Sequence, residues 1–379
     1  MGALRVLLAL SVVLSHVGGF FGNYLAGGFA SVEMFYIISG FYMATILTEK
    51  YDPRRDIGIF FSNRFLRIYS IYFLCLLISL AAYAVIYLRG HGGWIAYVIQ
   101  MAPTMTWAGK AWLILTNLFI FGQETTLFMK FDGGRLVFTP DGPGGPTPLW
   151  FMMPVPQAWS ISLELMFYCL VPFLIRNTTR ILVFIMAVTF LLRAAIYSAG
   201  YDIDPWVGRF FPLELGLFVM GMVARRLYDA HIGAISRNVQ ISVVVLFLGI
   251  TCILMSIFET LEARYALPMI YAVWAYHFMA LFALPCLFQL TRYSKLDSAI
   301  GNFSYPVYMI HWIVLMFYEA FAERFQWPAT GSWIKSVACV AVTFFLAWLI
   351  VISVEVPLDR YRQRRLARTA DIARNMARA

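Results

Sequence analysis

Charged residues are scarce in this sequence. Only 13% of its 379 residues are Asp, Glu, Lys or Arg, and 61% are hydrophobic. A typical soluble domain is about 25% charged and about 45–50% apolar, so the composition excludes an ordinary soluble protein. The mean hydropathy of +0.74 indicates that lipid solvates most of the surface. The composition therefore predicts an integral membrane protein.

Cysteine is also rare, and the common cofactor-binding motifs are missing. The five cysteines are Cys75, Cys169, Cys252, Cys286 and Cys339. All of them lie in apolar stretches and no two form a CxxC pair, which argues against a disulfide framework or a metal cluster. No P-loop, GxGxxG, HExxH or GxSxG motif occurs in the sequence. We therefore expect chemistry that needs neither a metal nor a bound redox cofactor.

Long apolar runs are abundant, and a membrane-spanning helix needs about 20 mostly apolar residues. Ten runs qualify, near residues 3–21, 28–48, 67–88, 155–175, 181–199, 206–226, 239–258, 266–290, 301–321 and 333–356. The predicted fold class is all-α, a polytopic membrane protein with about ten transmembrane helices. A shorter run at 111–122, within the long segment 89–154, predicts a re-entrant or interfacial helix. The Pro- and Gly-rich stretch 139–148 predicts an outer loop, either a lid over an acceptor or a plain connector.

The basic residues predict how the spans are oriented. Cytosolic loops of membrane proteins carry an excess of Lys and Arg. With the N-terminus in the cytosol, most of the 29 Lys and Arg residues fall on the inner side. Both termini are then cytosolic, and the net charge of +9 needs no nucleic-acid partner. Residues 1–359 form the membrane domain, and 360–379 form a basic cytosolic tail on the anionic inner leaflet.

Arg5 and His16 are the first candidates for chemistry, because ionisable groups inside spans are costly and often functional. They are eleven residues apart, about three helical turns, so they share a face and lie about 16 Å apart along the axis. The face joins a cationic inner end to a buried imidazole. Histidine serves as a general base for hydroxyl groups and also as a nucleophile. The alternative is a histidine hydrogen-bonded to a neighbouring helix.

Glu33 is expected beside His16, because both residues lie about 7–8 Å below the outer ends of consecutive helices. A carboxylate there would orient the imidazole and raise its basicity; the alternative is a Glu that reaches the interface. Arg64 and Arg67 share a helix face at the inner side and suit the binding of phosphates. Ordinary positive-inside charge explains Arg64 and Arg67 equally well or better.

Two polar stripes run along other spans. The first consists of Ser160, Glu164 and Tyr168, following Trp159; the second consists of Ser304, Tyr308 and His311. Polar stripes inside a membrane face protein or a cavity, so either stripe could line a tunnel or hold helices together. His277 and Arg193 are isolated polar residues without a pattern.

Several stretches, in order and spacing, resemble the acyltransferase family 3 membrane proteins, which O-acylate bacterial glycans. The stretches are Arg5 with His16, SVEMFYIISGF at 31–41, NRFLRIYSIY at 63–72 with its RxxR spacing, WSISLELMFY at 159–168 and GNFSYPVYMIHW at 301–312. The family often has Pro at the position of Ser70 and polar residues at those of Leu165 and Met166. The chain resembles a stand-alone member, without an appended esterase-like domain.

The resemblance implies an O-acyltransferase that uses acetyl-coenzyme A from the cytosol. The acceptor would be a hydroxyl of a sugar, a surface polysaccharide or a lipid-linked glycan at the bacterial inner membrane. His16 would be the catalytic residue with Glu33 as its partner, and Arg64 and Arg67 would hold the donor phosphates, with Arg5 along the route. For Ser39 two roles remain open, a hydrogen bond donated near the thioester and helix packing.

Two other functions fit a ten-span protein with polar residues near the midplane. The first is a proton-coupled transporter of a sugar or glycan, although the sequence shows no inverted repeat. The second is a scaffold in a glycan-assembly complex. Consumption of acetyl-coenzyme A distinguishes the acyltransferase from both. Direct attack by the acceptor and an acyl-histidine intermediate are equally compatible with the sequence.

Overall fold

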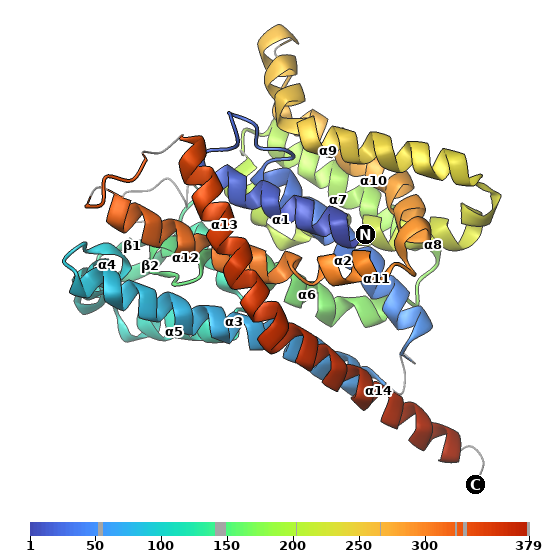
Figure 1. The fold of residues 1–379 in the computed structure, drawn as a ribbon, viewed down its shortest axis with the longest axis horizontal. Coiled ribbons are helices and arrows are strands. Elements are labelled where there is room, and N and C mark those ends of the chain that lie inside the picture. The colour runs from blue at the N-terminus through green and yellow to red at the C-terminus, as the bar shows by residue number, and fades with distance from the viewer. Residues whose placement is uncertain are drawn as a thin grey trace.

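The computed structural model describes residues 1–51, 56–140, 149–201, 203–265, 267–322, 324–328 and 332–376. The all-α prediction is confirmed, because helices make up most of these ranges (Figure 1). Most of the predicted loop 139–148, and the basic residues Arg54 and Arg55, lie outside the described residues.

Each of the ten predicted apolar runs contains a helix of the bundle. These helices are α1 (Gly2–Val17), α2 (Gly28–Glu49), α3 (Ile57–Leu88), α6 (Trp159–Leu174), α7 (Thr179–Ser198), α8 (Phe211–His231), α9 (Arg237–Tyr265), α10 (Met269–Thr291), α12 (Ser304–Ala322) and α13 (Trp333–Ile350). Within the described ranges, nine helical segments are long and apolar enough to cross a membrane. The shorter α1 ends at Val17 because Gly18 takes a left-handed backbone conformation (φ 104°).

The described residues of the segment 89–154 fold into a small subdomain of short elements. These are α4 (Gly93–Met101), η1 (Ala102–Thr104), α5 (Trp107–Phe119), η2 (Gln123–Phe128), strands β1 (Met129–Asp132) and β2 (Arg135–Phe138), and η4 (Leu149–Met152), with η5 (Pro156–Ala158) following. Helix α5 overlaps the predicted run 111–122. The antiparallel hairpin pairs Met129 with Phe138 and was not expected. Its signal is Gly133-Gly134, both with positive φ, in the turn between two short apolar runs.

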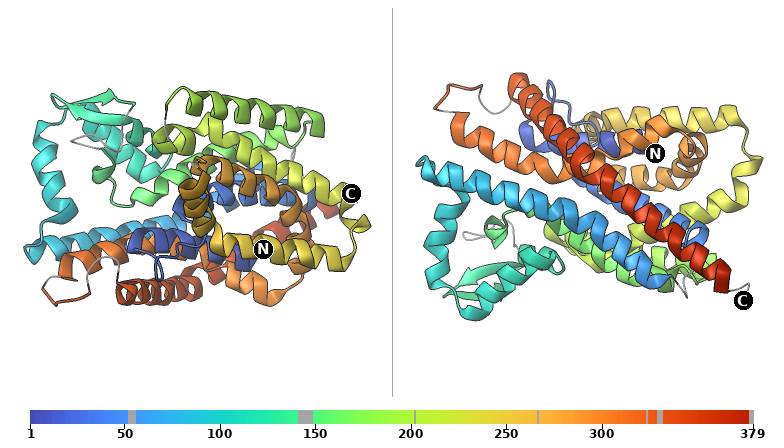
Figure 2. Two further views of the ribbon diagram at one scale, coloured as in Figure 1. Left: turned by 90° about the horizontal axis from the view of Figure 1, so that it is seen from above. Right: turned by 60° about the horizontal axis from the view of Figure 1, so that its bottom comes forward.

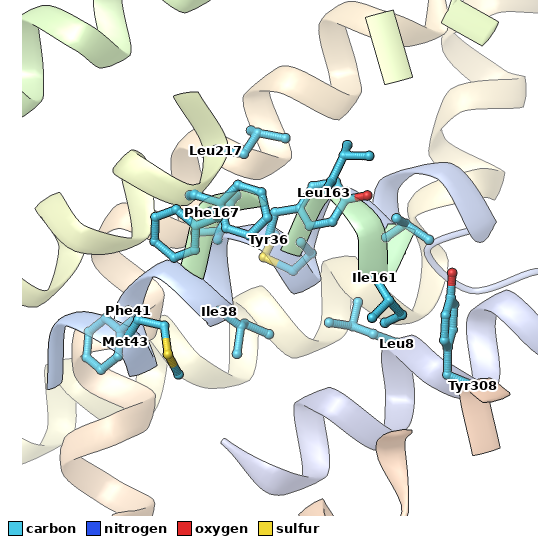
Figure 3. Close-up of a cluster of buried hydrophobic side chains, with 14 of the residues drawn as sticks. Leu8, Tyr36, Ile38, Phe41, Met43, Ile161, Leu163, Phe167, Leu217 and Tyr308 are labelled. Atoms are coloured by element: carbon cyan, nitrogen blue, oxygen red, sulfur yellow. The ribbon is translucent and has the colours of Figure 1, made fainter. Parts of the chain in front are cut away.

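The centre of the bundle is a close contact between α2 and α8. A methyl group on Gly40 would lie 1.9 Å from the carbonyl oxygen of Phe218, and one on Gly221 equally close to that of Ile37. Only glycine permits this approach. Tyr36 and Phe167 both stack on the ring of Phe218, at 4.7 and 4.3 Å between centroids, and Figure 3 shows them in the apolar core.

Both ends of the described chain lie at the same end of the bundle. The α-amino group of Met1 forms an ion pair with Asp297 (2.7 Å) in α11 (Lys295–Gly301). Helix α13 continues through η8 (Val351–Glu355) into α14 (Val356–Met376). Helix α14 lies against the first half of α3 (Figure 2), where Arg365 donates a hydrogen bond to Ser62 (2.9 Å). Most of the basic tail 360–379 is therefore helical, and its first part packs on protein.

Candidate active site

A cavity of about 620 Å³ runs into the bundle from the end where α2 finishes and α3 begins. The exposed residues Lys50 and Gln363 line it at that end, so the cavity is open there. Six of the predicted site residues line its wall: Arg5, Ser39, Arg64, Arg67, Glu164 and Tyr168. Residues from α1, α2, α3 and α6, far apart in the sequence, thus face one space.

Glu164 is the centre of the polar wall. Its Oε1 accepts a hydrogen bond from the hydroxyl of Ser39 (2.7 Å) and another from the hydroxyl of Tyr168, one helical turn away. The first bond ties α2 to α6. Ser39 and Gly40 therefore have different contacts, since Ser39 is part of the cavity wall and Gly40 packs on Phe218.

Arg64, near the open end, is buried and has unpaired donors, whereas Arg5 and Arg67 are half-buried. Arg64 is 7% exposed, and its Nε and Nη1 atoms have no hydrogen-bond partner among the described residues. Its guanidinium lies 6.0 Å from the ring centroid of Phe60, and that of Arg5 lies 5.9 Å from the ring of Tyr42. A buried guanidinium with unpaired donors beside a cavity is suited to bind an anion.

Ser160 and Tyr308 form the far end of the cavity. Their hydroxyl oxygens are 2.7 Å apart, and both side chains are buried. The Tyr308 ring lies 5.8 Å from the imidazole of His311. Tyr308 thus lines the cavity and contacts His311, which does not line it, and the two polar stripes predicted on α6 and α12 meet here.

His16 lies beyond this end of the cavity, stacked on His311. The ring centroids are 5.4 Å apart and the planes differ by 25°; the ring of Trp312 meets His16 edge-on at 5.2 Å. His16 is exposed, whereas His311 is buried. His311 Nδ1 lies 2.6 Å from the carbonyl oxygen of Tyr308. Because a carbonyl oxygen can only accept a hydrogen bond, Nδ1 carries the proton in the neutral ring, and Nε2 has an unprotonated lone pair.

The expected contact between Glu33 and His16 is not found in the described part of the chain. Instead, the Glu33 carboxylate is paired with Arg193 of α7, whose Nη2 also binds Glu214 of α8 at 2.7 Å. His277 Nδ1 lies 3.5 Å from Glu33 Oε2. We call Glu33, Arg193, Glu214 and His277 the buried charge cluster.

Depth in the membrane explains the buried charge cluster. Glu33, Arg193 and Glu214 each lie within about two turns of the same end of the bundle. A buried carboxylate is stabilised far more by a guanidinium than by a neutral imidazole. Arg193 was visible in the sequence as an isolated polar residue. The sequence analysis does not single out its partner Glu214. The available signal is that Glu214 is an acidic residue near the start of an apolar run, at the same depth as Glu33.

Trp159 does not line the cavity. The guanidinium carbon of Arg209 instead lies 4.3 Å from the ring centroid of Trp159. Arg209 also forms a two-point ion pair with the exposed Asp204. The predicted place of Trp159 in a tunnel wall therefore has no counterpart in this cavity. Among the described residues, no group of three or more His, Cys, Asp or Glu side chains could hold a metal ion.

The fold and this cavity define a polytopic membrane protein with a polar site inside the helix bundle. The family model described as "Acyltransferase domain", that of acyltransferase family 3, matches residues 1–352. The chain therefore belongs to this family and is a membrane acyltransferase.

One curated relative is similar to part of the chain. It is "Protein 2 in picA locus" from Rhizobium radiobacter, 33% identical over 88 residues, which are 23% of this chain and 46% of the relative. The match thus spans about half the length of that relative. No solved structure matches the chain significantly.

Proposed function

We propose that this acyltransferase moves an acyl group, most simply acetyl, from cytosolic acyl-coenzyme A to a hydroxyl of a sugar, a surface polysaccharide or a lipid-linked glycan. One observation carries the proposal. A single cavity connects the arginines at its open end, Arg64 and Arg67, with Tyr308, whose ring lies against His311, the stacking partner of His16. A donor could therefore keep its charged part at one end while its thioester approaches the other.

The donor's phosphates would bind Arg64 and Arg67, whose guanidinium groups match phosphate geometry. The uncharged pantetheine arm would pass Arg5 and the hydroxyl groups on the wall at Ser39 and Tyr168. These hydroxyl groups already donate to Glu164, so they are held in place and add polar acceptors along the route. This arrangement moves an acyl group through the membrane without moving the nucleotide.

His16 would perform the transfer, by one of two routes. In the first, an imidazole nitrogen takes the proton of the acceptor hydroxyl, the oxygen attacks the thioester carbonyl, and the C–S bond breaks as the thiolate recovers that proton. In the second, the imidazole attacks first, releases the thiol and passes the acyl group on. Stacking on His311 holds the His16 ring in one plane, and Tyr308 would have to shift to admit the thioester.

The acceptor would approach His16 from the exposed side. The Trp312 ring beside His16 offers an aromatic face against which the C–H groups of a sugar ring can pack. Membrane lipid surrounds the bundle, which would suit a lipid-linked acceptor. In the proposed topology the protein lies in a bacterial inner membrane and both of its termini are in the cytosol.

The test is release of free thiol from acetyl-coenzyme A by the full chain in liposomes, with a panel of glycan acceptors. We expect His16→Ala to lower the rate by about 10²–10⁴-fold, the usual contribution of a general base. His231→Ala is the matched control, because His231 is an exposed histidine at the end of α8 and should leave the rate unchanged.

Two results would oppose the proposal. Full activity in His16→Ala would move the chemistry to another residue, with His311 and Glu164 the next candidates. No thiol release from acetyl-, succinyl- or longer acyl-coenzyme A with any acceptor would favour a proton-coupled transporter of a sugar or glycan instead.

A further inference from the structure

Helix α14 forms one wall of the cavity. The lining residues on and just before this helix are Glu355, Asp359, Arg362, Gln363 and Leu366. Their spacing of three and four residues places them on one face. This face turns toward α3, since Arg365, one turn from Arg362, donates to Ser62 at 2.9 Å and to Asn63 at 3.4 Å. The tail thus reaches the residue next to Arg64.

Arg362 is buried and only partly paired. It is 7% exposed. Its Nη2 donates to Asp359 (2.8 Å) and lies 3.8 Å from Glu355. Its Nε is buried and has no hydrogen-bond partner among the residues that the structure describes. An unsatisfied buried donor is destabilising, so a further acceptor would be expected to stabilise this side chain.

Arg362 also faces charges of its own sign. Arg67 and Arg64 both lie close enough to repel its guanidinium, and all three side chains line the same cavity. Arg64 likewise has unpaired buried donors, at Nε and Nη1. Clustered guanidinium groups with free N–H donors are the usual surroundings of a multiply charged phosphate ligand.

We propose that Arg362 is a third ligand for the donor's phosphates, so that α14 and α3 bind the phosphorylated end of acyl-coenzyme A between them. This inference rests on the proposed function. Acyl-coenzyme A carries both a pyrophosphate and a further phosphate, so it offers acceptors for guanidinium groups on both helices. The C-terminal helix is then part of the active site, where the sequence predicted a tail on the lipid surface.

The test compares two donors that share a thioester and differ in phosphates, acetyl-coenzyme A and S-acetylpantetheine. In Arg362→Ala we expect KM for acetyl-coenzyme A to rise about 10- to 100-fold, the range for losing hydrogen bonds to a charged ligand. The kcat value and the KM for S-acetylpantetheine should not change. Arg364→Ala is the matched control, because Arg364 is an exposed arginine on the same helix outside the cavity wall.

A second variant covers the case in which Arg362→Ala does not fold. Arg362→Lys keeps the charge beside Asp359 but loses the planar, two-point donor, so KM for acetyl-coenzyme A should still rise. Unchanged KM for acetyl-coenzyme A in a folded Arg362 variant overturns this inference alone. A wild-type protein that neither binds nor consumes acetyl-coenzyme A, measured by calorimetry in nanodiscs, overturns the proposed function as well.

Discussion

Arg193 and Arg64 are both buried arginines on membrane helices, yet their surroundings differ. Arg193 is 0% exposed, and each of its two terminal nitrogens meets a carboxylate, Glu33 or Glu214. Arg64 has two buried nitrogens without a partner among the described residues and lies beside a cavity. Protein carboxylates neutralise Arg193, whereas two nitrogens of Arg64 have no hydrogen-bond partner among the described residues.

The difference shows how to separate structural from functional charges inside a membrane. A charge in a span is costly wherever it lies, so its presence alone does not indicate a function. A charge whose partners all come from other helices holds those helices together. A charge that keeps free donors toward a cavity points to a ligand, and Arg64 and Arg362 share this property.

The largest effect is expected for Arg193→Ala. This change leaves the carboxylates of Glu33 and Glu214 facing each other in a buried site. Breaking a buried ion pair from one side is destabilising by about 3–5 kcal/mol. We expect the melting temperature of the purified protein in detergent to fall sharply, or the folded protein to be lost. A melting temperature equal to that of the wild type would remove the structural role of Arg193.

A smaller effect, of a different kind, is expected for Arg64→Ala. Its affinity for acetyl-coenzyme A, measured by calorimetry, should fall about 10- to 100-fold, because hydrogen bonds to a charged ligand contribute about 1.5–3 kcal/mol. The melting temperature should not fall, since the change removes an unpaired buried charge. A loss of stability with undiminished donor affinity would place Arg64 in the same class as Arg193.

Glu33→Gln tests the sequence-based role of Glu33 as a partner of His16. Arg193 keeps the carboxylate of Glu214, and the Gln amide oxygen can still accept from Arg193, so the free energy of unfolding should change by less than the about 3–5 kcal/mol expected for Arg193→Ala. The rate of thiol release per folded molecule should stay within a few-fold of wild type. If the rate instead falls as far as in His16→Ala, Glu33 takes part in the chemistry despite its contact with Arg193.

The smallest effect is expected for Ser39→Ala. Tyr168 still donates to the same oxygen of Glu164, so the carboxylate keeps one partner. Loss of one hydrogen bond is worth about 1 kcal/mol, or about fivefold in KM for acetyl-coenzyme A. The double change with Tyr168→Phe should exceed the sum of the single changes, because it leaves Glu164 without either donor. Additive effects would show that the two hydroxyl groups act independently.

Much of the fold could be predicted because apolar runs and their lengths are local properties. All ten apolar runs contain helices, and α5 overlaps the shorter run 111–122, from which the sequence predicts a further helix. The hairpin between Met129 and Phe138 was missed because short strands leave weak periodicity. The Arg64–Arg67 spacing indicated a common face, and both residues do line the cavity.

The partners of buried polar groups could not be predicted in the same way. Helix spacing gave Glu33 and His16 the same depth, and depth alone does not say which face of α2 turns toward α1 and which toward α7 and α8. Arg193 and His277, which showed no pattern in the sequence, both contact Glu33. His311, expected along a tunnel, is stacked on His16.

The sequence by itself determined that this chain is an all-α membrane protein, where its helices run, and which family its motifs resemble. These features depend on local composition and spacing, because a span needs only enough apolar length to cross the bilayer. Only the tertiary structure decided that Glu33 binds Arg193, that His16 stacks on His311 and that α14 lies against α3. Contacts between helices depend on how each helix is rotated and packed, and close approaches such as Gly40 on Phe218 set those rotations for the molecule as a whole.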